Sequence, residues 1–283
     1  MTHRLARALN MKEGELPLAL LAVGFHFCVL CGYFFLRPVR DAMGVSRGMS
    51  DLRWLFVVTS IVSLALVLAF GGVVARTNRR RFIPIAYLFV IVCLLAFSGL
   101  LVWDGLAGGG LIVSDTETVM ARGIGYSFYV WLSAINLFTT SIFWAFMVDV
   151  FDVDQGKRMF AFIGIGGTLG ALVGGTATTA ISSMTTSVLL PAGLMLLGAV
   201  FFAVGIIMML ALDRVALASS KSRLSNKSSA PLASNNLEGR TIGGTFWGGL
   251  RAVMSSPYLL GIGVWIVFMA TSNTMIYFTQ ANI

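Results

Sequence analysis

Long apolar stretches recur along this chain, and they constrain its fold more than any other feature. Each is long enough to cross a hydrocarbon core of about 30 Å. Because lipid offers no hydrogen-bond partner to an open backbone, each stretch is predicted to be a helix. Only 11% of the residues are charged, against about 25% in soluble domains. The sequence therefore predicts an all-α polytopic membrane protein. The predicted helices cover 16–36, 54–74, 82–102, 124–148, 160–181, 188–212 and 258–282.

The predicted helices form a block of six, followed by a polar segment and one further helix. The polar segment is rich in Ser, Asn, Lys and Arg, and its middle has the composition of a disordered linker. This layout resembles that of major-facilitator transporters, which are built from two helical bundles. We expect an N-terminal six-helix bundle at 1–212, a basic cytoplasmic linker at 213–256 and the first helix of a second bundle at 257–283. A full second bundle needs about five more helices, so a fragment or a truncated product is expected.

The positions of Lys and Arg predict the orientation of the chain. If the N-terminus is cytoplasmic, 15 of the 20 Lys and Arg residues fall in cytoplasmic segments. Four of the other five gather in the first outer loop, where basic residues are least expected. These four are Arg37, Arg40, Arg47 and Arg53.

Two of these arginines share a helix face with an aromatic residue. Tyr33, Arg37 and Arg40 are spaced by four and three residues, and His26 precedes Tyr33 by seven. A cation inside a membrane is costly and marks a functional site by default. The planar guanidinium suits phosphate or carboxylate, so we predict an anion site at Arg37 and Arg40. The alternative is that both arginines extend to lipid headgroups. For His26, a neutral hydrogen-bonded residue and a proton sensor both remain open.

A polar stripe also marks the fourth predicted helix. Its members repeat every three or four residues, and such a stripe faces either other helices or a water-filled cavity. We expect Asn136 to line the same cavity as Tyr33, with interhelical hydrogen bonding as the alternative. The stripe consists of Tyr126, Tyr129, Ser133, Asn136 and Thr140.

The loop between the second and third helices resembles the major-facilitator loop motif. Gly71, Arg76, Arg79 and Arg80 match that motif, whereas Ala75 replaces its Asp and Asn78 replaces its second Gly. The resemblance implies a gating latch between helix ends. A simple cluster of cytoplasmic basic residues is the alternative.

Glycines line one face of the fifth predicted helix. Gly166, Gly170 and Gly174 follow a four-residue repeat, which permits close approach of another helix backbone. The segment also resembles the glycine motif of antiporter-type major facilitators. We expect this face to be either a helix-packing contact or a sliding surface between bundles.

Several kinds of chemistry are not predicted. The cores of the first six helices carry no acidic residue, which favours anion exchange over proton symport. No nucleotide-hydrolysing phosphate loop, Ser-His-Asp set or metal-ligand cluster is present, so we expect no enzyme, cofactor or metal site. Cys28 and Cys31 have redox spacing but are expected to be buried helix residues.

The segment Leu36-Arg37-Pro38-Val39-Arg40-Asp41 resembles the end of the first helix in the ATP/ADP translocases, the nucleotide exchangers of plastids and intracellular bacteria. In that family an Arg is followed three residues later by a basic residue and then Asp. Segments 141–146, 153–158 and 162–166 also resemble the family. Segments 251–259 and 277–280 look still more like its bacterial relatives.

The resemblance implies exchange of nucleotides or related phosphorylated solutes. Arg40 falls where the family has a phosphate-contacting Lys, and Arg37 matches the family's Arg. The chain departs from the pattern at Pro38-Val39, which replace a polar pair, and at Asp149, which replaces an uncharged amide.

We therefore predict a secondary active carrier of the bacterial inner membrane that exchanges nucleotides or other organic anions by alternating access. Its expected partners are a small-molecule anion and the lipid bilayer, without nucleic acid. One alternative keeps this fold and carries another organic anion or a drug. The other is a truncated membrane protein that does not transport, whose basic linker contacts anionic lipid or a partner.

Overall fold

The computed structural model describes residues 15–45, 49–74, 79–109, 117–185, 187–226, 251 and 253–281. These residues form long helices and no strand, so the predicted all-α class is confirmed. The helices are α2 (Glu15–Val45), α3 (Met49–Val74), α4 (Arg79–Leu106), α5 (Val119–Val150), α6 (Val153–Met184), α7 (Leu190–Asn226) and α9 (Pro257–Ala281).

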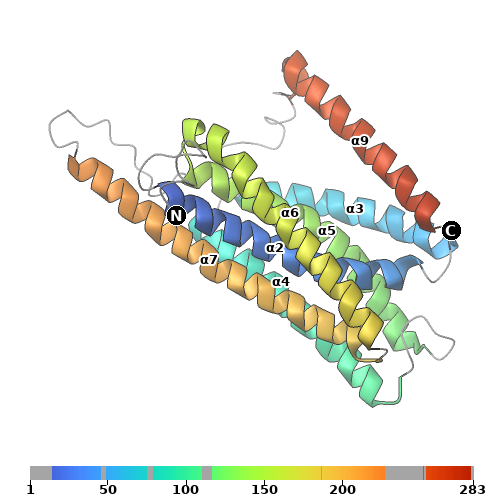
Figure 1. Cartoon of the computed structure of the whole chain (residues 1–283). Coiled ribbons are helices and arrows are strands. Elements are labelled where there is room, and N and C mark those ends of the chain that lie inside the picture. The colour runs from blue at the N-terminus through green and yellow to red at the C-terminus, as the bar shows by residue number, and fades with distance from the viewer. Residues whose placement is uncertain are drawn as a thin grey trace.

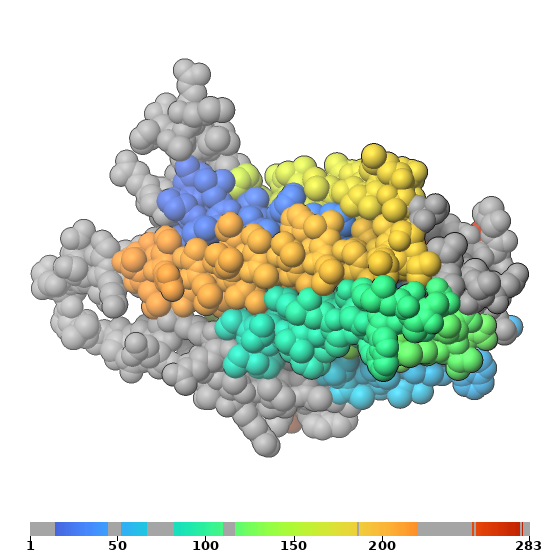
Figure 2. Space-filling model, turned by 90° about the horizontal axis from the view of Figure 1, so that it is seen from below, coloured from blue at the N-terminus to red at the C-terminus, as the bar shows by residue number. Residues whose placement is uncertain are grey.

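Helix α2 is the centre of the bundle. It packs against α6, α7 and α5, and only parts of it remain visible between α7 and α6 in the space-filling view (Figures 1 and 2). Aromatic rings fill the space between α2 and its neighbours. Phe25 of α2 contacts the rings of Tyr87 on α4 and Phe143 on α5. This enclosure leaves α2 little lipid contact, which suits the helix that carries the two arginines.

The outward faces of the other helices are apolar, as expected for lipid contact. Leu88 on α4, Ile207 on α7 and Leu172 on α6 are large exposed hydrophobic residues. Among the described residues, α2, α4, α5, α6, α7 and α9 are each long and apolar enough to cross a membrane. Helix α3 has 26 residues, and its described apolar stretch covers Leu52–Leu66.

Several helices are longer than the apolar runs indicated. Helix α2 continues through Pro38 to Val45, so the predicted end at residue 36 is wrong and the arginines lie within the helix. Helix α7 extends to Asn226, so the first part of the expected linker is helical. The reason is that an apolar run ends where charged residues begin, at Arg37 in α2 and at Asp213 in α7, although the backbone stays helical. Good helix formers such as Ala216 and Leu217 continue α7 beyond its apolar run.

The glycine face of α6 packs inside the bundle. A Cβ atom on Gly166, Gly170 or Gly174 would collide with backbone carbonyl oxygens of α2, which belong to Val23, Phe27 and Cys31. The face is therefore a close helix-packing contact within the bundle. A sliding surface between two bundles at these residues stays a prediction.

Helix α9 stands apart from the other helices along most of its length (Figure 1). Most of its described side chains are exposed, but Tyr277 near its C-terminal end packs on Phe56 of α3. Of the predicted loop latch, Arg76 lies outside the described residues. Arg79 and Arg80 begin α4, and their side chains also lie outside what the structure describes.

Candidate functional site

A cavity of about 480 Å³ lies where α2, α3, α5 and α9 approach one another. Small-molecule sites in proteins enclose roughly 300–1,000 Å³, so the cavity is large enough for a solute. Its lining combines two cations with hydroxyl, amide and aromatic groups. The lining residues are Leu30, Tyr33, Phe34, Arg37, Arg40, Phe56, Thr59, Tyr129, Ser133, Asn136, Asn273, Thr274, Ile276 and Tyr277.

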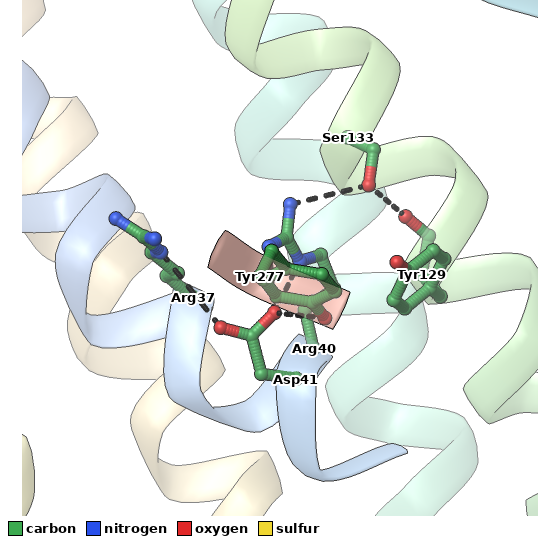
Figure 3. A network of polar contacts seen from close by, with 6 residues as sticks. All are labelled: Arg37, Arg40, Asp41, Tyr129, Ser133 and Tyr277. Atoms are coloured by element: carbon green, nitrogen blue, oxygen red, sulfur yellow. Dashed lines mark hydrogen bonds and ion pairs between the residues drawn. The ribbon is translucent and has the colours of Figure 1, made fainter. Parts of the chain in front are cut away.

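Arg40 is the more enclosed of the two arginines, with 13% of its side chain exposed. Its Nε and Nη2 atoms both donate to Oδ1 of Asp41, at 3.0 and 2.6 Å, as Figure 3 shows. Its Nη1 atom donates to the hydroxyl of Ser133 on α5 at 3.3 Å. The guanidinium carbon also lies 5.4 Å from the ring centre of Tyr129, within the range of a cation–π interaction. These contacts hold the cation among the side chains of α2 and α5.

Arg37 lies one helical turn before Asp41 and is more accessible, with 44% of its side chain exposed. Its Nε atom is 3.7 Å from Oδ2 of Asp41, so the carboxylate lies between the two guanidinium groups (Figure 3). The guanidinium carbon is 5.6 Å from the ring centre of Phe34. Arg37 thus keeps an accessible face that an anion in the cavity can contact.

Helix α5 supplies the polar wall of the cavity. Ser133 and Asn136 are three residues apart and therefore lie on one helix face with Tyr129. The Ser133 hydroxyl donates to the carbonyl of Tyr129 at 2.7 Å, which leaves its oxygen lone pairs toward Arg40. Across the cavity, the buried hydroxyl oxygen of Thr59 on α3 has no hydrogen-bond partner among the described residues. A polar ligand could supply the missing partner.

The structure brings together all four residues expected from the sequence to bind or surround an anion, namely Tyr33, Arg37, Arg40 and Asn136. Sequence reasoning missed the roles of Asp41, Thr59, Asn273 and Tyr277. Asp41 was visible within the Leu36–Asp41 motif, and a carboxylate beside two arginines is a signal of pairing. No local pattern identified Thr59 or Asn273, because their helices approach α2 only in the folded chain.

Two other polar residues lie away from the cavity. His26 is buried between α5 and α6, where its Nδ1 donates to the carbonyl of Ile163 at 2.9 Å and its ring stacks on Phe143. It is thus a hydrogen-bonded packing residue, the first of the two alternatives for this position. Asp149 is exposed near the C-terminal end of α5 and does not line the cavity.

A second polar cluster ties the N-terminal ends of α2 and α6 together. Glu15 is buried, with 2% of its side chain exposed, and its Oε1 accepts from Nε2 of Gln155 at 3.0 Å and from Nη2 of Arg158 at 3.3 Å. Gln155 also accepts from the backbone N–H of Asp152 at 3.1 Å, completing a capping box at the start of α6. This cluster fixes the two helices against each other at the end opposite the arginines.

Comparison with known families matches the chain to one of them. The sequence model of the family described as TLC ATP/ADP transporter matches residues 115–276, which are more than half of the chain. The match includes α5, α6, α7 and most of α9, whereas α2 with its two arginines precedes it. No curated protein and no solved structure matches the chain. The chain therefore belongs to the TLC ATP/ADP transporter family and is a polytopic membrane transporter rather than an enzyme.

Proposed function

We propose that this transporter exchanges nucleotides and that Arg37 and Arg40 bind the phosphate groups of the cargo. The observation that carries the proposal is the enclosed guanidinium of Arg40, which faces a cavity lined by a second, more accessible arginine. Guanidinium groups form paired, charge-assisted hydrogen bonds with phosphate oxygens. Holding two of them in the interior of a membrane protein is costly, and the single carboxylate of Asp41 compensates only one of the two charges.

The remaining lining suits the nucleoside part of the cargo. Phe56, Tyr129 and Tyr277 present aromatic rings, on which a base can stack. The unpaired hydroxyl of Thr59 and the amides of Asn136 and Asn273 offer hydrogen bonds to a base or a ribose. A lining that combines two cations with aromatic rings and amides suits an amphipathic anion better than inorganic phosphate alone.

The transport cycle proposed here is the alternating access of a major-facilitator fold. The first, second and fourth membrane helices of the first bundle (α2, α3 and α5) meet the first helix of the second bundle, α9, around the cavity. This arrangement supports a second bundle that begins at 257. The proposal keeps a first bundle at 1–212 and a linker at 213–256, whose first part is the helical end of α7. The excess of Lys and Arg in the segments on one side supports a cytoplasmic N-terminus. A bacterial inner membrane is part of the same proposal. Opposite rocking of the bundles would open the cavity to each side in turn.

Exchange in proteoliposomes tests the proposal. Vesicles containing the purified protein and loaded with unlabelled ADP are given labelled ATP, ADP or inorganic phosphate outside. We expect nucleotide uptake that requires internal nucleotide and that falls strongly in Arg40→Ala. Arg214→Ala serves as the control, because Arg214 is an exposed arginine of α7 that does not line the cavity. Uptake that is equal in both variants, or uptake of inorganic phosphate without uptake of ATP or ADP, would contradict the proposal.

A further inference from the structure

Asp41 occupies the position that a bound anion would take. Its Oδ1 accepts hydrogen bonds from Nε and Nη2 of Arg40 and from the hydroxyl of Tyr277, which lies 3.3 Å away. Its Oδ2 is 3.7 Å from Nε of Arg37. One carboxylate therefore engages both cavity cations and, in addition, a residue of α9 (Figure 3).

The donors used by Asp41 are those that a phosphate group needs. A guanidinium recognises carboxylate and phosphate oxygens with the same geometry, through its forked N–H groups. While Nε and Nη2 of Arg40 donate to Asp41, only the other edge of the guanidinium remains, and there Nη1 donates to Ser133. Full engagement of Arg40 by a cargo phosphate thus requires the carboxylate to move away.

We propose that Asp41 is a tethered counter-anion, which offsets one of the two positive charges of Arg37 and Arg40 in the empty carrier and competes with the phosphate of the cargo. The inference rests on the nucleotide function proposed above and adds a role for a residue that the function did not use. The pairing lowers the net charge of the arginine pair from two to one when no cargo is bound. An uncompensated pair of cations would be far more costly in a membrane interior.

Two consequences follow from such competition. First, the apparent affinity for nucleotide is reduced by the fraction of carriers in which Asp41 occupies the arginines. Second, the carboxylate can replace the departing phosphate, which promotes release. Asp41 also accepts a hydrogen bond from Tyr277, so its displacement changes a contact between α2 and α9 each time the cargo binds.

The experiment measures ADP binding and exchange for the wild-type protein and for Asp41→Asn. In Asp41→Asn no carboxylate competes with the cargo for the arginines. The carrier without ADP then lacks roughly one charge-assisted interaction, so ADP should bind at least about tenfold more tightly. ADP should also dissociate more slowly, and the maximal exchange rate should fall together with KM. Asp41→Ser is measured in parallel. It also removes the carboxylate, so the prediction can be tested even if Asp41→Asn does not fold.

Asp154→Asn is the matched control, since Asp154 is an exposed acid at the start of α6, with 93% of its side chain exposed. This variant removes the same charge from the chain and should leave ADP affinity unchanged. A purely structural role for Asp41 would weaken binding in its variants. Folded Asp41 variants that bind ADP no more tightly than the wild-type protein would overturn the counter-anion role.

The same measurements separate this inference from the proposed function. If Arg40→Ala loses ADP affinity while the Asp41 variants gain none, the counter-anion role fails and the nucleotide site remains. If the wild-type protein binds no ADP, or if Arg40→Ala binds it equally well, the proposed function fails, and the counter-anion role with it.

Discussion

The guanidinium of Arg40 on α2 donates to the hydroxyl of Ser133 on α5 at 3.3 Å, across 93 positions of the chain. This hydrogen bond orients the edge of Arg40 that Asp41 does not hold. It also places the polar face of α5 against the cation, so the geometry of the proposed site depends on two helices that are distant in sequence.

Replacement of Ser133 by Ala is therefore expected to weaken ADP binding moderately. Loss of one hydrogen bond to a charged group costs about 1.5–3 kcal/mol, and a hydroxyl that only orients the arginine should account for the lower end, roughly a tenfold loss of affinity. Ser141 provides the control. It also donates to the carbonyl four residues before it on α5, but it is exposed and outside the cavity. Ser141→Ala should bind ADP as the wild-type protein does, and equal losses in the two variants would argue against the orienting role.

Arg40→Lys should retain part of the function that Arg40→Ala loses. Lysine keeps the positive charge but lacks the fork that contacts Asp41 and Ser133 together. We expect ADP affinity between those of the wild-type protein and Arg40→Ala. Isothermal titration on the purified variants measures it. If Lys and Ala gave the same affinity, charge at this position would have no role.

The glycine face of α6 should tolerate no added side chain. In Gly170→Ala the new methyl group would meet the backbone carbonyl of Phe27, which cannot move without shifting α2. Overpacking of this kind costs about 1–3 kcal/mol. Thermal unfolding in detergent measures this loss of stability as a lower Tm than that of the wild-type protein. Gly164→Ala is the matched control on the same helix, because no atom of the described residues lies within 4 Å of its added Cβ atom. That variant should be neutral or slightly stabilised, since Ala favours helix by about 1 kcal/mol over Gly.

The buried carboxylate of Glu15 should make Arg158 important for stability. In Arg158→Ala the buried carboxylate of Glu15 loses a charged hydrogen-bond donor. Breaking a fully buried ion pair in this way lowers the free energy of unfolding by about 3 kcal/mol or more. We expect a smaller loss for this pair, because Arg158 is 25% exposed. The double variant with Glu15→Gln and Arg158→Ala should recover part of the stability that Arg158→Ala loses, and a double-mutant cycle measures this coupling. Lys157→Ala, at an exposed neighbouring position, is expected to stay within about 0.5 kcal/mol of the wild-type protein. Purely additive effects of the Glu15 and Arg158 changes would contradict the coupling.

The sequence predicted much of this architecture because membrane burial leaves few alternatives. An apolar run of sufficient length must be a helix, and a polar residue such as Asn136 within it must turn inward. The helix ends were harder, since hydropathy marks where the apolar residues end and not the last hydrogen bond of α2 or α7. Contacts between distant helices were not predictable from local patterns. The pairing of Asp41 with Tyr277 and the packing of Gly170 on Phe27 belong to this class.

The most direct test of the central claim compares the binding of ADP and adenosine to the wild-type protein, Arg40→Ala and Arg214→Ala. Truncation of an enclosed charged partner costs about 2–5 kcal/mol, so Arg40→Ala should lose ADP affinity at least about 30-fold. Its affinity for adenosine, which has no phosphate, should be unchanged, and Arg214→Ala should bind both ligands as the wild-type protein does. Equal ADP affinity in the wild-type protein and Arg40→Ala, or equal losses for ADP and adenosine, would contradict a phosphate site at Arg40.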